Sequence, residues 1–410
     1  MIYTNASGTV AESLYGRATK AAAYALKARV LLYAASPLFN GNADYAKFAN
    51  EDGTLLFAPK DDSKWGKAAA AAKEAIDKIE GSSYYGLYYS DEPDNGYRNY
   101  MELFLPSKKW NKEYIFARNQ GTGYSDNIHQ EKCMAANGMG GWSGLCPTQE
   151  LVDAYEMANG STPIIGYNAD GTPIINGASG YSETGFAATA GKHYPAGVYN
   201  MYVGREPRFY ASINFNGQQW RGRQLEFWQG GKDGINVSKV DYCCTGYLLR
   251  KTADEGVDVI NGKGGMKEAS ILFRVGSLYL DYAEALNEAE GPVDDVYKYV
   301  DAIRKRAGLP GLAKGLDKDK MRERIQHERQ IELAFEAGHR YFDCHRWKIA
   351  EKTDNGYMHG MNITATNKVD YSKRSTVGDS RVFEKKHYLF PIPQSEMDKR
   401  IGLVQSPYWE

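Results

Sequence analysis

Small apolar residues recur at helical spacing near the start of the chain. In the segment 18–36, ATKAAAYALKARVLLYAAS, they repeat every three to four residues, which predicts one face of a helix. The Ser-Pro pair at 36–37 ends the pattern, because a residue before proline avoids helical backbone angles. A second alanine-rich helix is predicted over 63–79, with Ser63 as its N-cap and Gly81 just past its end. So many alanines on both helices indicate that other helices approach closely.

The pattern changes between 108 and 270, where Gly, Asn, Tyr and Trp dominate. Short β-like pieces appear there: EYIFARN, RFYASINF, QLEFW and TGYLLRK. The segment NADGT at 168–172 lies between two apolar runs and predicts a hairpin, whereas a Ca²⁺ loop would need more acidic ligands. A stretch this long exceeds a simple connection, so we expect a functional elaboration carried by a scaffold.

Helical periodicity returns towards the C-terminus. Helices are predicted over 270–290, 293–308 and 317–346, and a Gly-Pro turn separates the first two. Alanine-rich helix pairs joined by tight turns are similar to tetratricopeptide units, although the strict consensus of those repeats is absent. The tail from 387 onwards is bounded by prolines and predicted to be mostly irregular.

Composition narrows the possible functions. The net charge is −1, so no overall basic field would attract nucleic acid or anionic lipid. The five cysteines include no CxxC pair, which indicates neither a disulfide framework nor a zinc ribbon. No apolar run reaches the roughly 18 residues of a membrane span, and no signal peptide is visible after Met1. The 31 tyrosines indicate much half-exposed aromatic surface, which suits either sugar stacking or a loop-rich fold.

The densest charge cluster is the segment 327–347, HERQIELAFEAGHRYFDCHRW. Three explanations are possible: an acid/base cluster, a metal site, or buried ion pairs that hold helices together. Helical spacing predicts that Arg329 pairs with Glu332 and that Glu336 pairs with Arg340, with a similar pair between Asp343 and Arg346. A basic neighbour lowers the pKa of a carboxyl, whereas a catalytic acid needs a raised one. We therefore expect a structural role and no catalytic residue here.

The sequence contains few of the motifs that a metal site or a hydrolase active site would require. Di-iron bundles use two Glu-x-x-His motifs, and only Glu336–His339 fits that spacing here. The sequence after His327 lacks the second histidine of a zinc protease motif. A glycoside hydrolase would need a pair of carboxyls across a cleft, and the sequence does not single one out. We expect no metal and no cofactor.

Several segments, in this order, resemble the SusD/RagB family of outer-membrane glycan-binding lipoproteins. They span Gly16 to Trp409, nearly the whole chain, and their ordered succession is more specific than any one of them. The segments are GRATKAAAYALKARVLLYAASPLFN, PTQELVDAYEMANG, REPRFYASINFNGQQW, TGYLLRK, FRVGSLYLDYAEALNEA, AIRKRAGLP, ERQIELAFEAGHRYFDCHRW and YLFPIPQSEM, followed by QSPYW.

The resemblance implies a mainly α fold, in which a tetratricopeptide-like scaffold carries a long insertion of loops and short strands. It divides the chain into a helical part over 1–107, a ligand-binding part over 108–270, and helices with a tail over 271–410, all within one composite domain. Family members bind an oligosaccharide at the cell surface without catalysis. They pass it to a TonB-dependent, SusC-like transporter and are attached to the outer membrane, facing outwards, by an N-terminal lipid anchor.

One departure concerns the N-terminal side. Family members carry more residues before the first matched helix, including a signal peptide and a lipidated cysteine. We therefore expect this sequence to be a C-terminal portion, and any ligand site within it to be partial.

Sugar binding needs exposed aromatic rings for the C–H face of a pyranose and polar groups for its hydroxyls. The Gly-rich stretch 118–144 offers Tyr124 and Trp142 with Asn127 nearby. In the family, binding aromatics precede the block that PTQELVDAYE resembles, which suits Trp142. A second candidate pair is Trp220 and Trp228, which both face one side if they lie in a short hairpin. For each residue the alternative is burial in the core.

The sequence thus favours a non-enzymatic glycan receptor. Two other classes stay open at this stage: an intracellular tetratricopeptide-type adaptor that binds peptides, and a glycoside hydrolase. An adaptor of this kind would have a plain concave helical surface without the long aromatic insertion. A hydrolase would release reducing ends from a polysaccharide, whereas a binding protein would not.

Overall fold

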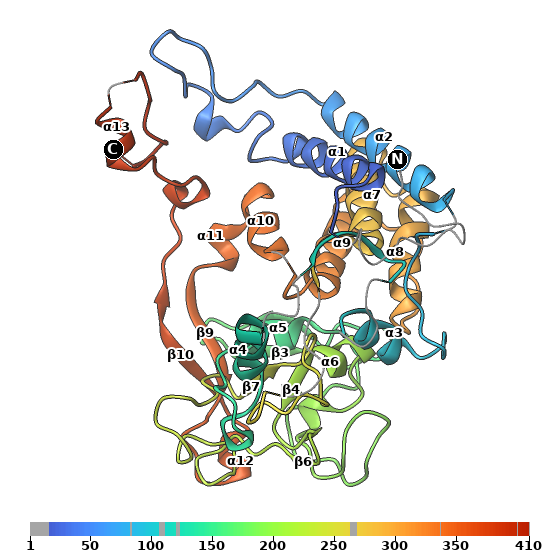
Figure 1. Cartoon of the computed structure of the whole chain (residues 1–410), viewed down its shortest axis with the longest axis vertical. Coiled ribbons are helices and arrows are strands. Elements are labelled where there is room, and N and C mark those ends of the chain that lie inside the picture. The colour runs from blue at the N-terminus through green and yellow to red at the C-terminus, as the bar shows by residue number, and fades with distance from the viewer. Residues whose placement is uncertain are drawn as a thin grey trace.

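The computed structural model describes residues 16–399, except 83, 106–110, 120–123, 263–268 and 337, together with 401–409. The described chain forms two tiers (Figure 1). Long helices from both ends of the sequence lie side by side in the upper tier, and loops with short strands make up the lower tier. The predicted helical scaffold with a loop- and strand-rich insertion is confirmed.

The scaffold begins with α1 (Lys20–Ala35), which packs on α2 (Ser63–Glu80). Helix α2 in turn packs on α7 (Val275–Glu290), and α7 contacts α8 (Asp294–Arg306) and α9 (Lys318–Glu332). The alanines of α1 and α2 lie in these contacts, since Ala28, Ala68, Ala72 and Ala75 are at most 1% exposed. The predicted close approach of helices is therefore confirmed.

The predicted ends of the first two helices are nearly right. Helix α1 ends where expected, with Ser36 as its C-cap, and Gly81 caps α2. Ser63, however, is the first helical residue of α2 and not its N-cap, which is Asp62. Asp62 makes no side-chain capping bond; the carboxylate of the preceding residue, Asp61, accepts hydrogen bonds from both the backbone N–H and the hydroxyl of Ser63.

Two predicted helices are wrong in part. Residues up to Arg274 of the predicted helix 270–290 form β8 (Ala269–Arg274), which pairs antiparallel with β1 (Tyr114–Asn119). The predicted helix 317–346 is broken between α9 and α10 (His339–Arg346), followed by α11 (Ala350–Thr353). Phe335 and Gly338 adopt positive φ angles of 63° and 72° there, which a right-handed helix cannot contain.

The lower tier consists of separate two-stranded ribbons joined by long loops. The predicted hairpin is confirmed, because β2 (Ile164–Tyr167) pairs antiparallel with β3 (Pro173–Ile175). The predicted strand RFYASINF is half helix, with α6 (Pro207–Ser212) leading into β4 (Ile213–Phe215). The other ribbons pair β4 with β7 (Tyr247–Leu249), β5 (Gln219–Trp220) with β6 (Arg223–Gln224), and β9 (Gly356–Met361) with β10 (Arg374–Arg381). Short helices complete this part of the chain: α3 (Gly96–Leu103), α4 (Tyr124–Met134), α5 (Gln149–Ala154) and α12 (Lys368–Tyr371). The last helix, α13 (Gln394–Met397), lies in the upper tier near the C-terminus (Figure 1).

Buried ion pairs join the two tiers. Glu332 of α9 accepts from Arg274 and Arg306, and also from Arg208 of α6 in the lower tier. The carboxylate of Glu336 lies 2.5 Å from the ammonium of Lys251, which follows β7. The charged segment 327–347 therefore makes its main contacts with residues far away in sequence.

The predicted local pairs within that segment need correction. The guanidinium of Arg329 binds Asp343 and Asp281 in place of Glu332. Glu336 binds Arg274 and Lys251 in place of Arg340. The predicted pair of Asp343 with Arg346 is present, at 2.8 Å.

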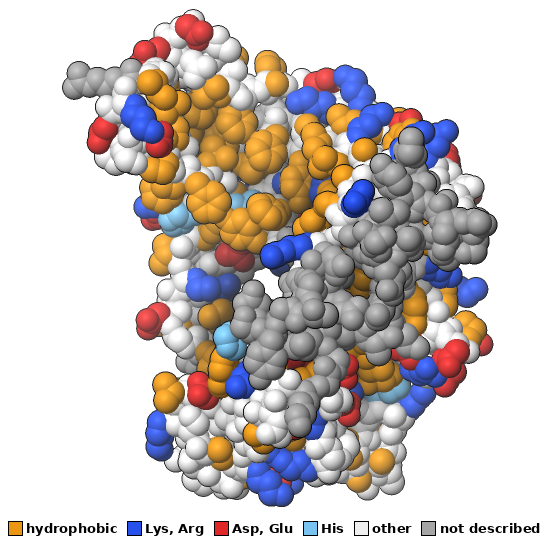
Figure 2. Space-filling model, in the orientation of Figure 1, with side chains coloured by type: hydrophobic (Ala, Val, Ile, Leu, Met, Phe, Trp, Pro, Cys, Tyr) orange, Lys and Arg blue, Asp and Glu red, His pale blue; other side chains and the backbone are white. Residues whose placement is uncertain are grey.

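Hydrophobic side chains gather on the upper face of the molecule, near α1, α10 and the C-terminal tail (Figure 2). They surround a hollow of about 270 Å³ lined by Tyr33, Leu38, Phe39, Tyr341, Phe342, His345, Arg346, Tyr388, Leu389 and Phe390. Phe390 is 76% exposed. In the described part of the chain, no helix combines the length and the apolar character that a membrane span requires.

Candidate functional site

A pocket of about 380 Å³ lies in the lower tier. Segments far apart in the sequence form it: the start of α3, the loop 191–195, the turn before β5, and the end of β7. Its walls combine aromatic rings with amide and cationic groups. The lining residues are Tyr97, Gly191, Lys192, His193, Tyr194, Pro195, Gln218, Gln219 and Arg250.

Aromatic rings stack along one wall of this pocket. The ring centres of Tyr97 and His193 are 4.7 Å apart, with an angle of 28° between their planes. His193 also packs on Tyr210 at 5.2 Å, and Tyr194 lies nearly parallel to Tyr210 at 6.1 Å. Burial, together with Lys192 and Arg250, lowers the pKa of His193 to about 4, so its imidazole is neutral at pH 7.

The loop that carries His193 and Tyr194 is closed by a tight turn. The N–H of Gly191 donates to the carbonyl of Tyr194 at 2.9 Å. A Cβ at Gly191 would lie 2.4 Å from the Tyr194 ring, so only glycine leaves room for that ring. The turn therefore fixes where the aromatic wall stands.

Arg250 is held at the pocket by two rings. Its guanidinium carbon lies 4.7 Å from the centre of the Trp220 ring and 5.5 Å from that of Tyr97. Nη2 donates to the Tyr97 hydroxyl at 2.6 Å and to the Glu255 carboxylate at 3.1 Å. Nε and Nη1 have no hydrogen-bond partner among the described residues, although Arg250 is only 6% exposed.

Gln218 brings a second buried group with spare hydrogen-bonding capacity. It is 5% exposed and lines the pocket, and its side-chain oxygen lacks a partner in the described structure. Buried polar atoms normally have partners, so unpaired ones at a pocket indicate a place for a polar ligand. The pocket can thus stack an apolar face on its rings and bond hydroxyl groups through the amide and cationic side chains of its lining.

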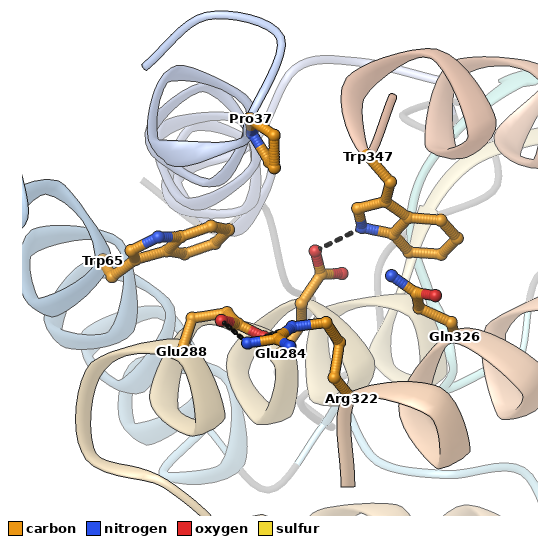
Figure 3. A pocket seen from close by; sticks show the side chains of 7 residues that line it. All are labelled: Pro37, Trp65, Glu284, Glu288, Arg322, Gln326 and Trp347. Carbon is orange, nitrogen blue, oxygen red and sulfur yellow. Dashed lines mark hydrogen bonds and ion pairs between the residues drawn. The ribbon is translucent and has the colours of Figure 1, made fainter. Parts of the chain in front are cut away.

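The scaffold contains a smaller pocket of about 180 Å³, shown in Figure 3. Trp65 and Trp347 stand on opposite sides of it, above the side chains of α7 and α9. Its charged groups are already paired: the Trp347 indole N–H donates to Glu284 at 2.7 Å, and both carboxylate oxygens of Glu288 accept from Arg322. This pocket offers less free bonding capacity than the one at Arg250.

The sequence-predicted residue Trp142 is 36% exposed, just after a turn that follows α4. The ammonium of Lys132 lies 5.3 Å from its ring centre and the His129 ring is 5.2 Å away, so both partly cover the indole. Tyr124 and Asn127 lie in α4, but their side chains are outside the described residues. Trp142 stays a proposed contact.

The two remaining predicted residues are more buried. Trp220 is 2% exposed in the core and its ring lies against Arg250, so it cannot serve as a sugar platform and instead positions the arginine. Trp228 is half-buried against the same core, with the ammonium of Lys368 at 5.2 Å from its ring. Trp220, predicted from the sequence as a sugar contact, thus lies next to the pocket but contacts Arg250 from within the core.

The acids of the segment 327–347 are held ionised. Burial disfavours the charge of Glu332, but Arg306, Arg274 and Arg208 outweigh it and lower its pKa to about 2. Burial likewise opposes the charge of Glu336, and Arg274 and Lys251 lower its pKa further still. Among the described residues, no His, Cys, Asp and Glu side chains gather as a metal site would require. These contacts give the segment a structural role.

Fold and site together define a class of protein: a helical-repeat scaffold that carries an aromatic, polar pocket on a loop-rich half. The model of the SusD family matches residues 106–409. The chain belongs to the SusD family.

Solved structures of related proteins agree with this assignment. BT4246 superposes with a TM-score of 0.79 at 28% identity, covering 98% of this chain and 72% of that one. A SusD-like protein from Bacteroides fragilis (BF3747) superposes with a TM-score of 0.69 at 27% identity, covering 98% of this chain and 68% of that one.

Curated relatives match over shorter stretches. SusD-like protein P25 of Formosa agariphila is 42% identical over 82 residues, or 19% of this chain and 15% of the relative. SusD-like protein P2 of the same organism is 29% identical over 154 residues, or 35% of this chain and 26% of the relative. The chain therefore matches only a minor part of each curated relative.

Proposed function

We propose that this protein binds an oligosaccharide or polysaccharide at the cell surface without altering it. The observation that carries the proposal is the pocket at Arg250, where stacked rings stand beside amide and cationic side chains. Stacking covers the apolar face of a sugar, and the amide and cationic side chains that line the pocket bond its hydroxyls. The volume of about 380 Å³ suits a small ligand or one or two units of a longer chain.

A binding role without catalysis is supported by the state of the buried acids. A glycoside hydrolase needs one carboxyl whose pKa is raised and which reaches the substrate. Burial raises the pKa of Glu206, but this residue is 0% exposed and accepts from Arg208 and from the backbone N–H of Glu156. Glu206 therefore belongs to the interior and not to a cleft.

Family membership supports the rest of the proposal. We propose that the whole protein acts on the outer face of the outer membrane, attached by an N-terminal lipid anchor. There it would hand its glycan to a TonB-dependent, SusC-like transporter. Copurification of the membrane-anchored protein with a co-expressed SusC-like transporter tests this partner, and recovery of the protein without it would contradict the proposal.

The binding function is tested by affinity electrophoresis through gels that contain different polysaccharides. We expect wild type to be retarded by at least one glycan, with its reducing ends unchanged after incubation. Tyr194→Ala, which removes a ring of the pocket, should weaken retardation about fivefold, as the loss of about 1 kcal/mol of stacking implies. Trp142→Ala tests the second proposed contact in the same gels.

Tyr357→Ala is the matched control, because Tyr357 is 54% exposed on β9 and does not line the pocket. The control should migrate as wild type does. Retardation by no glycan would refute the proposed function. Unchanged retardation of Tyr194→Ala would refute the pocket as its site, and new reducing ends would show catalysis.

A further inference from the structure

Three of the five cysteines come together in the lower tier, beside the segment that carries Trp142. Cys146 follows that tryptophan closely, and Cys243 and Cys244 are neighbours in the loop just before β7. Cys146 Sγ donates to Cys243 Sγ at 3.8 Å, although 97 residues separate the two along the chain. All three are free thiols in the structure. The fold therefore brings together a pair that no spacing motif in the sequence marks.

Hydrogen bonds to β7 hold the two segments against each other. Leu249 of β7 donates its N–H to the carbonyl of Leu145 at 2.9 Å, directly beside Cys146. Cys243 Sγ donates to the carbonyl of Tyr247, the first residue of β7, also at 2.9 Å. The two sulfurs are thus positioned close together before any covalent bond joins them.

The pair has the geometry and the access that a disulfide requires. The sulfurs of a disulfide lie about 2.05 Å apart, and rotation about the side-chain bonds covers the difference from the observed distance. Cys243 is only 2% exposed, whereas Cys146 is half-buried, so an oxidant reaches the pair at Cys146. The hydrogen bond to Cys243 raises the pKa of Cys146, so its thiol is protonated at pH 7 and reacts slowly. These features suit a lasting cross-link and not a rapid redox catalyst.

We propose that Cys146 and Cys243 form a disulfide when a low-molecular-weight disulfide oxidises the protein. Cys146 loses its proton to water and attacks one sulfur of the oxidant, whose S–S bond breaks, and the departing half takes up a proton. Cys243 then attacks Cys146 Sγ and releases the second half as a thiol, which receives the proton of Cys243. Two protein thiols are thereby oxidised to one disulfide, and the oxidant is reduced to two thiols. Disulfides persist in oxidising surroundings such as a cell surface, the location proposed above.

The disulfide ties the segment that carries Trp142 to the loop before β7. The loop that it closes spans 97 residues, and closing a long loop restricts the unfolded chain more than closing a short one. Oxidised protein should therefore unfold about 3–5 °C above reduced protein. The bond can form whether or not the protein binds glycan, so its test is independent of the binding test.

The test oxidises the full chain, first reduced and then freed of reductant, with glutathione disulfide. Intact-mass spectrometry should show the loss of two hydrogen atoms per chain, whereas a mixed disulfide at the exposed Cys244 adds the mass of glutathione. Trypsin leaves Cys133 with Cys146 in one peptide and Cys243 with Cys244 in another, so variants identify the pair. Cys146→Ser and Cys243→Ala should abolish the link between these peptides. Cys133→Ser and Cys244→Ser are the matched controls and should retain it.

Several outcomes would overturn this disulfide and leave glycan binding in place. Wild type that keeps all its hydrogens, or that gains only mixed disulfides with glutathione, lacks the bond. A link that survives Cys243→Ala, or that Cys244→Ser removes, assigns the bond to Cys244 and overturns the proposed pair. If Cys243→Ala does not fold, Cys244→Ser decides, because it leaves Cys243 as the one cysteine of its peptide. Equal unfolding midpoints of oxidised and reduced wild type, a comparison that needs no variant, also overturn the cross-link.

Discussion

Individual charges in this protein stabilise the scaffold, and we propose that others contribute to ligand binding at the pocket. Glu336 and Arg250 illustrate the difference, since both are buried and both have an oppositely charged neighbour. Glu336 accepts from Arg274 and Lys251 with both of its oxygens. Arg250 lines a cavity, and its Nε and Nη1 have no hydrogen-bond partner within the described part of the chain. The sequence pattern points to the charged segment that contains Glu336, because a high density of charged residues can be seen along a predicted helix. The hydrogen-bonding state of Arg250 depends on the folded structure and cannot be seen in the sequence.

Replacing Glu336 should therefore cost stability and not specificity. Glu336→Gln leaves Lys251 and Arg274 buried with one fewer negative charge, so we expect a loss of about 3 kcal/mol in the free energy of unfolding. Urea denaturation measures it. Glu396→Gln is the control, since Glu396 forms an exposed pair with Lys399 that should contribute less than about 1 kcal/mol. A folded Glu336→Gln protein with altered glycan preference would contradict the structural role.

Stability should also depend on pH through His339. Burial, followed by Arg29 and Arg329, lowers the pKa of this imidazole from 6.5 to about 4. The unfolded chain then binds a proton between pH 6.5 and 4 that the folded protein does not, so stability falls as pH falls through that range. The contribution amounts to roughly 3 kcal/mol. His339→Gln should flatten the pH profile of the unfolding free energy in that window, and a profile as steep as that of wild type would contradict the assignment.

Elements were predictable where the pattern is long and regular. The alanine-rich helices α1 and α2 and the β2–β3 hairpin follow from spacing and turn residues alone. The strand β8 could not be predicted in this way, because its apolar run SILF leads directly into α7. Periodicity alone cannot distinguish a short strand from the start of a helix. The break after α9 was missed for a related reason: it needs Phe335 in a conformation that sequence does not favour.

That break gives a prediction about glycine. Gly338 has φ +72° and precedes α10, and a Cβ there would lie 3.3 Å from the Phe342 ring. Gly338→Ala should lower stability by about 1 kcal/mol, because an L-residue is strained in that region. Gly66 lies within α2 with open space around it, so Gly66→Ala should raise stability by about 0.5–1 kcal/mol. Thermal denaturation compares the two, and effects of the same sign would contradict the argument.

The candidate site could not be assembled from sequence, since its parts come from four separate segments. Tyr97 lies in α3, while Arg250 follows β7 more than a hundred residues later. One signal was present in the sequence: the segment GKHYP at 191–195 places two rings in a loop bounded by glycine and proline. Trp220 was predicted as a contact because its spacing from Trp228 suits one side of a hairpin, whereas in the structure its ring packs on the guanidinium of Arg250.

At the scale of the whole molecule, buried ion pairs connect the scaffold with the loop-rich tier. Glu156, just after α5, binds Arg304 of α8 at 2.9 Å and also binds Arg324 of α9. Burial opposes its ionisation, but Arg324 and Arg304 outweigh this and lower its pKa. Arg208 of α6 reaches Glu328 and Glu332 of α9 in the same way. Separating the two tiers would leave buried charges without their partners, which costs several kcal/mol of free energy. We therefore expect the two tiers to unfold together.

We therefore propose one composite domain over the parts 1–107, 108–270 and 271–410, and predict a single calorimetric unfolding transition. Its van't Hoff enthalpy should equal the calorimetric one, as two-state behaviour requires. Glu156→Gln should lower the midpoint temperature of that single transition, because Arg304 and Arg324 lose the negative charge that neutralises them between the tiers. Glu150→Gln is the control on the same α5 region, where the acid is 40% exposed and pairs with His359. Two resolved peaks in wild type, or a separate early transition in Glu156→Gln, would instead show that the loop-rich tier folds independently of its scaffold.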